Sequence, residues 1–77
     1  MKKLIITSKD IEKSDSYWSD YIGKEDVSNF DGDIIIEKNL GYVKFFSINI
    51  TGSLISEAGS GIKAGEGIEA GWGIKAG

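Results

Sequence analysis

The sequence predicts a mainly β protein with some α+β character: a β-solenoid in the C-terminal half, capped by an N-terminal strand and a short helix. A six-residue unit repeats in the last third of the chain, the preceding segments are rich in β-branched residues, and the glycines alternate with isoleucine at a regular period. A chain of 77 residues forms a single domain at most. We expect residues 1–32 to form the capping region, residues 33–57 to be strands that enter the solenoid, and residues 58–77 to be the repeats.

The N-terminal region is predicted to contain one strand and one helix. Residues 3–7, KLIIT, are rich in β-branched residues and favour a strand. Apolar residues then recur at helical spacing, which predicts a helix that begins near Ser8 and ends near Gly23. Ser14 and Ser16 weaken this helix, so a shorter helix over residues 15–22 fits the sequence equally well.

The middle of the chain changes from loop to strand. Residues 23–32 contain turn-forming Asn, Asp and Gly and are predicted to be a loop. Strands are expected over residues 34–37 and 42–50, with a turn at residues 39–41 between them. Thr51, Gly52 and Ser53 then turn the chain back toward the core.

The repeat consists of three hexads over residues 58–75: AGSGIK, AGEGIE and AGWGIK. Side chains alternate along a strand, so each Ile and the Ala two positions later face the same way, while Lys or Glu between them faces outward. The glycines permit positive φ angles and a close approach between coils. We therefore expect the isoleucines to fill an interior, the 18 residues of three hexads to complete one triangular coil, and the variable residues Ser60, Glu66 and Trp72 to project outward.

In its I-x-A-G-x-G spacing the segment 58–77 resembles the left-handed hexapeptide-repeat β-helix, and residues 31–57 resemble it more loosely. As a small acidic protein of short repetitive coils, the chain is also similar in kind to pentapeptide-repeat proteins, although its period is six. Hexapeptide-repeat acyltransferases carry a catalytic His that this chain lacks, so the resemblance implies no acyl transfer. Some pentapeptide-repeat proteins imitate duplex DNA and block DNA-binding enzymes. The resemblance to them is an analogy of shape and charge, and fold alone does not give function.

The composition argues against catalysis. The chain has no His and no Cys, and no motif places a Ser–Lys or Asp–Asp pair. Asp31-x-Asp33 lacks the later Glu of a calcium loop and is better explained as a turn. We expect a non-enzymatic protein with no catalytic residues, no metal and no cofactor.

The hydropathy pattern contains no signal for a membrane. No run of about 18 apolar residues occurs, and the N-terminal apolar run is too short for a secretory signal. We expect a protein of the bacterial cytoplasm that has no membrane partner.

The acidic residues are concentrated in one block. Residues 10–37 carry nine acids and two lysines, a charge of −7 within a chain whose net charge is −3. Such a block repels nucleic acid and attracts basic protein surfaces, and the aromatic residues within it suit a binding face. The alternative is a solvated acidic surface whose aromatics pack on the sheet; Trp72 in turn either anchors a contact or covers the end of the solenoid. The candidate partner-binding residues are Asp15, Tyr17, Trp18, Asp20, Tyr21, Glu25, Asp26, Asp31, Asp33 and Trp72.

The leading hypothesis is an acidic binding protein, an anti-CRISPR-like inhibitor from a phage or mobile element. It would occupy a basic, nucleic-acid-binding groove of a bacterial enzyme complex without binding nucleic acid itself. Its phosphate-like carboxylates would be those of Asp15, Asp20, Glu25, Asp26, Asp31 and Asp33. The alternatives are a structural repeat module that self-associates end to end through its uncapped C-terminal coil as a homo-oligomer, and a fragment of a longer repeat protein.

Overall fold

The computed structural model describes residues 2–14 and 16–76, which form ten strands and one short 3-10 helix. In chain order the elements are β1 (Lys2–Ile6), η1 (Ser8–Asp10), β2 (Ile11–Lys13), β3 (Trp18–Tyr21), β4 (Gly32–Ile36), β5 (Gly41–Phe45), β6 (Ile48–Ile50), β7 (Ser53–Ser56), β8 (Ser60–Ala64), β9 (Ile68–Ala70) and β10 (Gly73–Ala76). The prediction of a mainly β protein is confirmed. The predicted α-helix is wrong, because no described residue lies in one.

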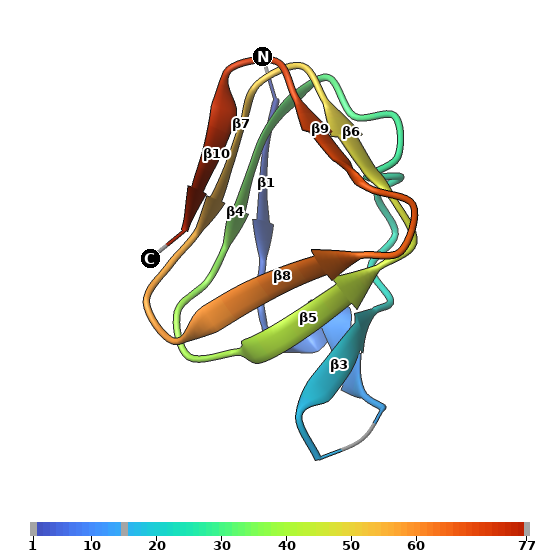
Figure 1. Cartoon of the computed structure of the whole chain (residues 1–77), viewed down its shortest axis with the longest axis vertical. Helices are drawn as coiled ribbons and strands as arrows, with labels where there is room; N and C mark the ends of the chain where they lie inside the picture. Colours follow the sequence, from blue (N-terminus) through green and yellow to red (C-terminus); the bar gives the residue numbers. More distant parts are fainter. Residues whose placement is uncertain (1, 15, 77) are drawn as a thin grey trace.

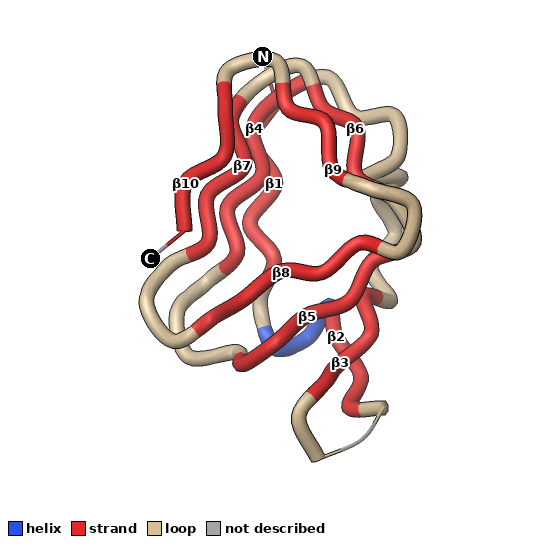
Figure 2. Tube along the Cα trace, viewed as in Figure 1, coloured by secondary structure: helices blue, strands red, loops and turns tan. Residues whose placement is uncertain are grey.

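The strands wind around a triangular outline with one sheet on each side (Figure 1). The sheet orders are β1-β4-β7-β10, β2-β3-β5-β8 and β6-β9. Each strand from β7 onward therefore stacks on the strand three before it in chain order (Figure 2). All of these strand pairs are parallel except β2 with β3. Parallel stacking at a constant interval is the arrangement of a β-solenoid.

The coil is longer than the hexads predict. Cα partners lie 20 residues apart between β4 and β7, between β6 and β9 and between β7 and β10, and 19 apart between β5 and β8. The inward residues Ile62, Ile68 and Ile74 follow one another at six-residue steps, but Ile62 comes eight residues after Leu54. The two additional residues lie in the turn before β8, where Ala58 is exposed. The predicted coil length of 18 residues is therefore wrong, because one corner of the coil is longer than a hexad provides.

The interior is a column of branched aliphatic side chains that is closed in the middle and open at its C-terminal end. Ile34, Leu54 and Ile74 are partners in three successive strands of one sheet. Ile34 and Leu54 are 0% exposed, whereas Ile74 is 54% exposed because no described strand lies beyond it. Each coil is thus buried by its neighbours on both sides.

The N-terminal region consists of strands and one 3-10 turn where a helix was predicted. The Thr7 backbone N–H donates to Asp10 Oδ2 at 2.9 Å, and this capping box supports a single 3-10 turn. Ile11 is already extended, with φ −131° and ψ 153°. The antiparallel pair of β2 and β3 follows and extends the sheet that contains β5. Cross-strand pairing outweighs the weak helical spacing here, as β-propensity depends on context.

The segment predicted as one strand over residues 42–50 is two strands with a corner between them. Phe45 and Ile48 are both buried, but side chains three positions apart face opposite sides of a straight strand. Both reach the interior because the chain turns at Phe46 and Ser47, which leaves Phe46 77% exposed.

The first variable position of the repeat is also corrected. Ser60 is only 9% exposed, and its Oγ accepts the Leu40 backbone N–H at 3.0 Å and donates to the Glu37 carbonyl. It thereby joins two successive corners through its side chain, so the prediction that Ser60 projects outward is wrong. Glu66 and Trp72, at the equivalent positions, are exposed as expected.

Candidate protein-binding site

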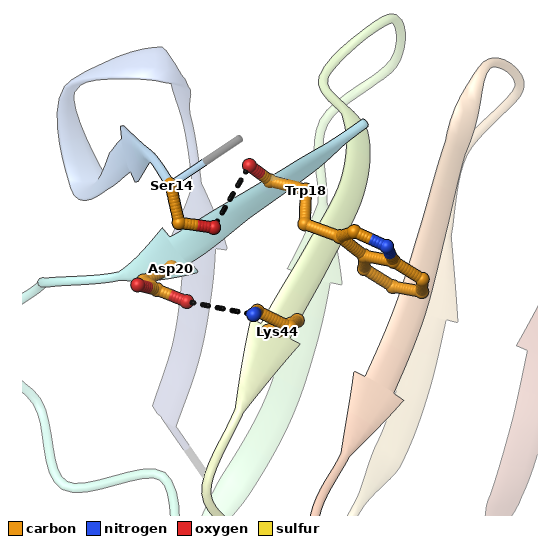
Figure 3. A network of polar contacts seen from close by, with 4 residues as sticks. All are labelled: Ser14, Trp18, Asp20 and Lys44. Carbon is orange, nitrogen blue, oxygen red and sulfur yellow. Dashed lines mark hydrogen bonds and ion pairs between the residues drawn. The ribbon is translucent and has the colours of Figure 1, made fainter. Parts of the chain in front are cut away.

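The outer face of the β2-β3-β5-β8 sheet carries a row of charges in register. Glu12 lies opposite Asp20, Asp20 opposite Lys44, and Lys44 opposite Lys63. Two acids therefore lie on the N-terminal strands and two bases on the C-terminal strands. Asp20 Oδ1 is 3.8 Å from Lys44 Nζ in an exposed ion pair (Figure 3). Such a pair contributes little to folding and leaves this face polar.

An aromatic row runs beside the charged row. The rings of Trp18 and Tyr42 lie 5.0 Å apart, and Lys63 Nζ lies 5.2 Å from the centre of the Trp18 ring. Gly61 gives the Tyr42 ring room, since a Cβ there would lie 2.6 Å from Cδ1 of that ring. Ser14 Oγ donates to the Trp18 carbonyl at 3.1 Å and closes the β2–β3 pair (Figure 3). The aromatic side chains are thus fixed on the sheet and only partly available to a partner.

A groove of about 500 Å³ lies where this sheet meets the loop that follows β3. Its apolar lining comes from Tyr21, Val27, Phe45 and Phe46. The Tyr21 and Phe45 rings are 5.2 Å apart, and the Tyr21 hydroxyl donates to the Glu25 carbonyl at 3.0 Å. One aromatic side chain therefore both lines the groove and fixes the loop that borders it.

Burial and, to a lesser extent, the charge of Asp10 raise the pKa of Tyr21. Both effects disfavour the phenolate. The hydroxyl therefore keeps the proton that it donates to the loop at neutral pH.

The charge of the groove is unevenly distributed. Lys44 and Lys63 line it but are already engaged with Asp20 and with the Trp18 ring. Glu25 and Asp26 are exposed on the loop. Hydrogen bonds from the Ser28 side chain and backbone to Asp26 Oδ1 lower the pKa of Asp26. The loop side of the groove is therefore negative at neutral pH.

The structure gathers part of the predicted set at this groove. Four predicted residues line it: Asp20, Tyr21, Glu25 and Asp26. Trp18 lies beside it on the sheet, and Tyr17 is 75% exposed in the connection between β2 and β3. Asp15 lies outside the described residues.

Other predicted residues lie at a different corner. The Thr51 hydroxyl donates to Asp31 Oδ1 at 2.7 Å, and the Ser53 backbone N–H donates to Asp33 Oδ1 at 2.8 Å. These two carboxylates tie one coil to the next. Trp72 is 78% exposed in the turn between β9 and β10. The described carboxylates of the acidic block are thus spread over several corners.

Sequence reasoning missed Phe46, Lys44 and Lys63. Phe46 lies in the middle of the strand predicted over residues 42–50, and the alternation of side chains along a strand does not predict a groove. The odd spacing of the apolar residues around it was the available signal for a corner. The two lysines join the site only through strand pairing between residues that are 19 positions apart.

The described residues provide no metal site, since they contain no group of three or more His, Cys, Asp or Glu side chains suited to hold an ion. They also contain no helix long and apolar enough to cross a membrane. Comparison of the chain with protein-family models, with curated proteins and with solved structures gives no match.

Proposed function

We propose that this protein is a non-enzymatic binding module that docks a basic segment of another protein in the groove beside β5. The observation that carries the proposal is the meeting of an apolar lining with two exposed carboxylates. Phe46, 77% exposed at the corner, supplies the contact area of an anchor residue. Glu25 and Asp26 supply the charge that selects a basic partner.

The charge balance supports a basic partner over an acidic one. The two lysines of the groove are directed to Asp20 and Trp18, whereas the loop carboxylates face solvent. A segment with Arg or Lys next to an apolar residue would match this arrangement. The basic groove of a bacterial nucleic-acid-binding enzyme complex offers such segments, so an anti-CRISPR-like inhibitor is the specific form of this proposal. Because the carboxylates of the acidic block are dispersed, we propose that the partner contacts the groove alone, without a row of carboxylates spaced like DNA phosphates.

The test uses a defined peptide, acetyl-Arg-Leu-Arg-Leu-Arg-amide, titrated into the isotope-labelled 77-residue chain and followed by amide NMR shifts. We expect saturable shifts at Val27, Phe46 and Gly65, and none of comparable size with a peptide in which Glu replaces Arg. Phe46→Ser removes the apolar anchor and is expected to weaken binding at least about tenfold.

Glu25→Lys and Glu57→Lys form a matched pair, since both change an exposed Glu and only the first lies at the groove. Glu25→Lys is expected to weaken binding and Glu57→Lys to leave it within about twofold at 150 mM salt. Equal losses from both variants would show that the peptide senses only the net charge and would refute the groove as the site. A failure of the Arg peptide to bind would also refute the proposal.

A further inference from the structure

The C-terminal coil of the solenoid presents an open surface. The strands β8, β9 and β10 each lie at the end of their sheet, so each has one neighbouring strand within the described chain. The inward residues of this coil are Ile62 and Ile68, which are partly buried, and Ile74, which is 54% exposed. Their partners one coil earlier are at most 2% exposed. The open surface therefore combines apolar side chains with the outer hydrogen-bonding groups of three edge strands.

We propose that this surface binds the same surface of a second copy of the chain, in a two-fold symmetric dimer that places β9 of each copy beside β10 of the other. The interface adjoins the groove described above at β8, where Lys63 also lines the groove, but it does not depend on the function of the groove.

The two ends of the solenoid differ, and this difference favours the two-fold arrangement over a head-to-tail stack. At the N-terminal end β2 runs antiparallel along the edge of β3 and covers that side. A head-to-tail stack would have to displace β2. Two C-terminal coils instead meet without displacement, and rotation about an axis across the coil makes the facing strands antiparallel. Antiparallel strands pair well, and a symmetric contact closes after two copies.

The charges of the last coil, together with the residue that lies at the axis, select one of the three possible two-fold axes. The outward residues are Lys63 on β8, Glu69 on β9 and Lys75 on β10. An axis through the turn between β9 and β10 places Glu69 opposite Lys75 twice. It also brings the two exposed Trp72 side chains together at the axis, where paired aromatic rings add contact energy.

Each two-fold axis pairs two strands of the last coil and faces the third with its own copy: the selected axis faces β8 with β8, and the axis between β8 and β9 pairs Lys63 with Glu69. The other two axes differ from the selected one because each places an acidic residue at the axis, opposite its own copy. An axis through the turn between β8 and β9 faces exposed Glu66 with its own copy. An axis through the turn before β8 faces β9 with β9 and so opposes Glu69 to Glu69. Like charges directly opposite across antiparallel strands are destabilising.

The interface is small. The three edge strands contain twelve residues, compared with about 20–30 residues a side in a standard interface. The dimer is therefore expected to be weak and to form only as the concentration rises.

Sedimentation equilibrium of the 77-residue chain tests the dimer across about 1 μM to 1 mM. We expect the mass to rise from 8.3 kDa toward twice that value. Ile74→Lys is expected to weaken association at least about tenfold. Ile5→Lys is the matched control, since Ile5 is 50% exposed and lies on the outer face of β1, away from the last coil. Circular dichroism of each variant serves as the control for folding.

Charge exchange tests the axis. Glu69→Lys and Lys75→Glu are each expected to weaken the dimer, and the double variant to restore it within about threefold. In a Trp18→Phe background Trp72 is the only tryptophan, and its emission should change as the dimer forms. A monomeric mass at every concentration would overturn the proposal, as would equal losses from Ile5→Lys and Ile74→Lys. Restoration of Glu69→Lys by Lys63→Glu in place of Lys75→Glu would overturn the assigned pairing.

Discussion

Ile34→Ala and Ile74→Ala, in the same column of inward side chains, compare the free energy of unfolding that burial contributes in a middle coil and in the last coil. Ile34 is 0% exposed and Ile74 is 54% exposed, and both are partners of Leu54. Ile→Ala at a fully buried site costs about 2–5 kcal/mol, from lost transfer free energy and the cavity left behind. At Ile74 about half of the side chain is already in water and no closed cavity forms, so the cost falls to about 1 kcal/mol. The same substitution should thus differ by at least about twofold between the two coils.

The assay is urea unfolding followed by circular dichroism, at a concentration low enough to keep the chain monomeric. A domain of this length has a free energy of unfolding of about 4–12 kcal/mol, so Ile34→Ala lowers it by a large fraction. Ile34→Val, at about 0.5–1.5 kcal/mol, provides a milder comparison with Ile74→Val if the Ala variant is unfolded. Equal losses at both positions would refute the stacked-coil account, because they would require equal burial of the middle and terminal coils.

Three further predictions concern corners and titration. Gly52→Ala should destabilise the fold by at least about 2 kcal/mol, because the new Cβ would overlap a backbone carbonyl of the preceding coil; Gly65→Ala, with 3.7 Å to its nearest neighbour, should be nearly neutral by thermal melting. Ser60→Ala leaves a backbone N–H and a carbonyl without their side-chain partner. It should lower the free energy of unfolding by about 1–3 kcal/mol, and with it the melting temperature by several degrees. The raised pKa of Tyr21 adds stability that is fully present below pH 10 and is lost as the pH rises through the folded-state value, so Tyr21→Phe should flatten the alkaline part of the stability profile.

The solenoid could be predicted from the repeat because its cause is local. Within each hexad a single inward Ile and a bend-permitting Gly pair suffice to define a side and a corner. Ile62, Ile68 and Ile74 do stack on the inward residues of the preceding coil. The first strand was predicted over residues 3–7 from its β-branched residues and is observed one residue earlier, over Lys2–Ile6.

The rest depended on contacts distant in sequence. Trp18 and Tyr21 fit a helical spacing, yet they form a strand because β5 pairs with Trp18 and β2 pairs with Tyr21. The turn before β8 takes up two more residues than the other corners of the repeat, and the exposed or buried state of Ser60 follows from that length. The groove joins a loop near Glu25 to lysines on two later strands. Only the coil register brings these segments together, and the register cannot be read from a single hexad.

The coil register itself is the central claim, and nuclear Overhauser effects between methyl groups test it most directly. In a chain with labelled isoleucine, leucine and valine methyls, the account predicts cross-peaks from Leu54 to both Ile34 and Ile74, and from Val43 to Ile62. Absence of these cross-peaks, or cross-peaks that place residue pairs 18 positions apart throughout, would contradict it.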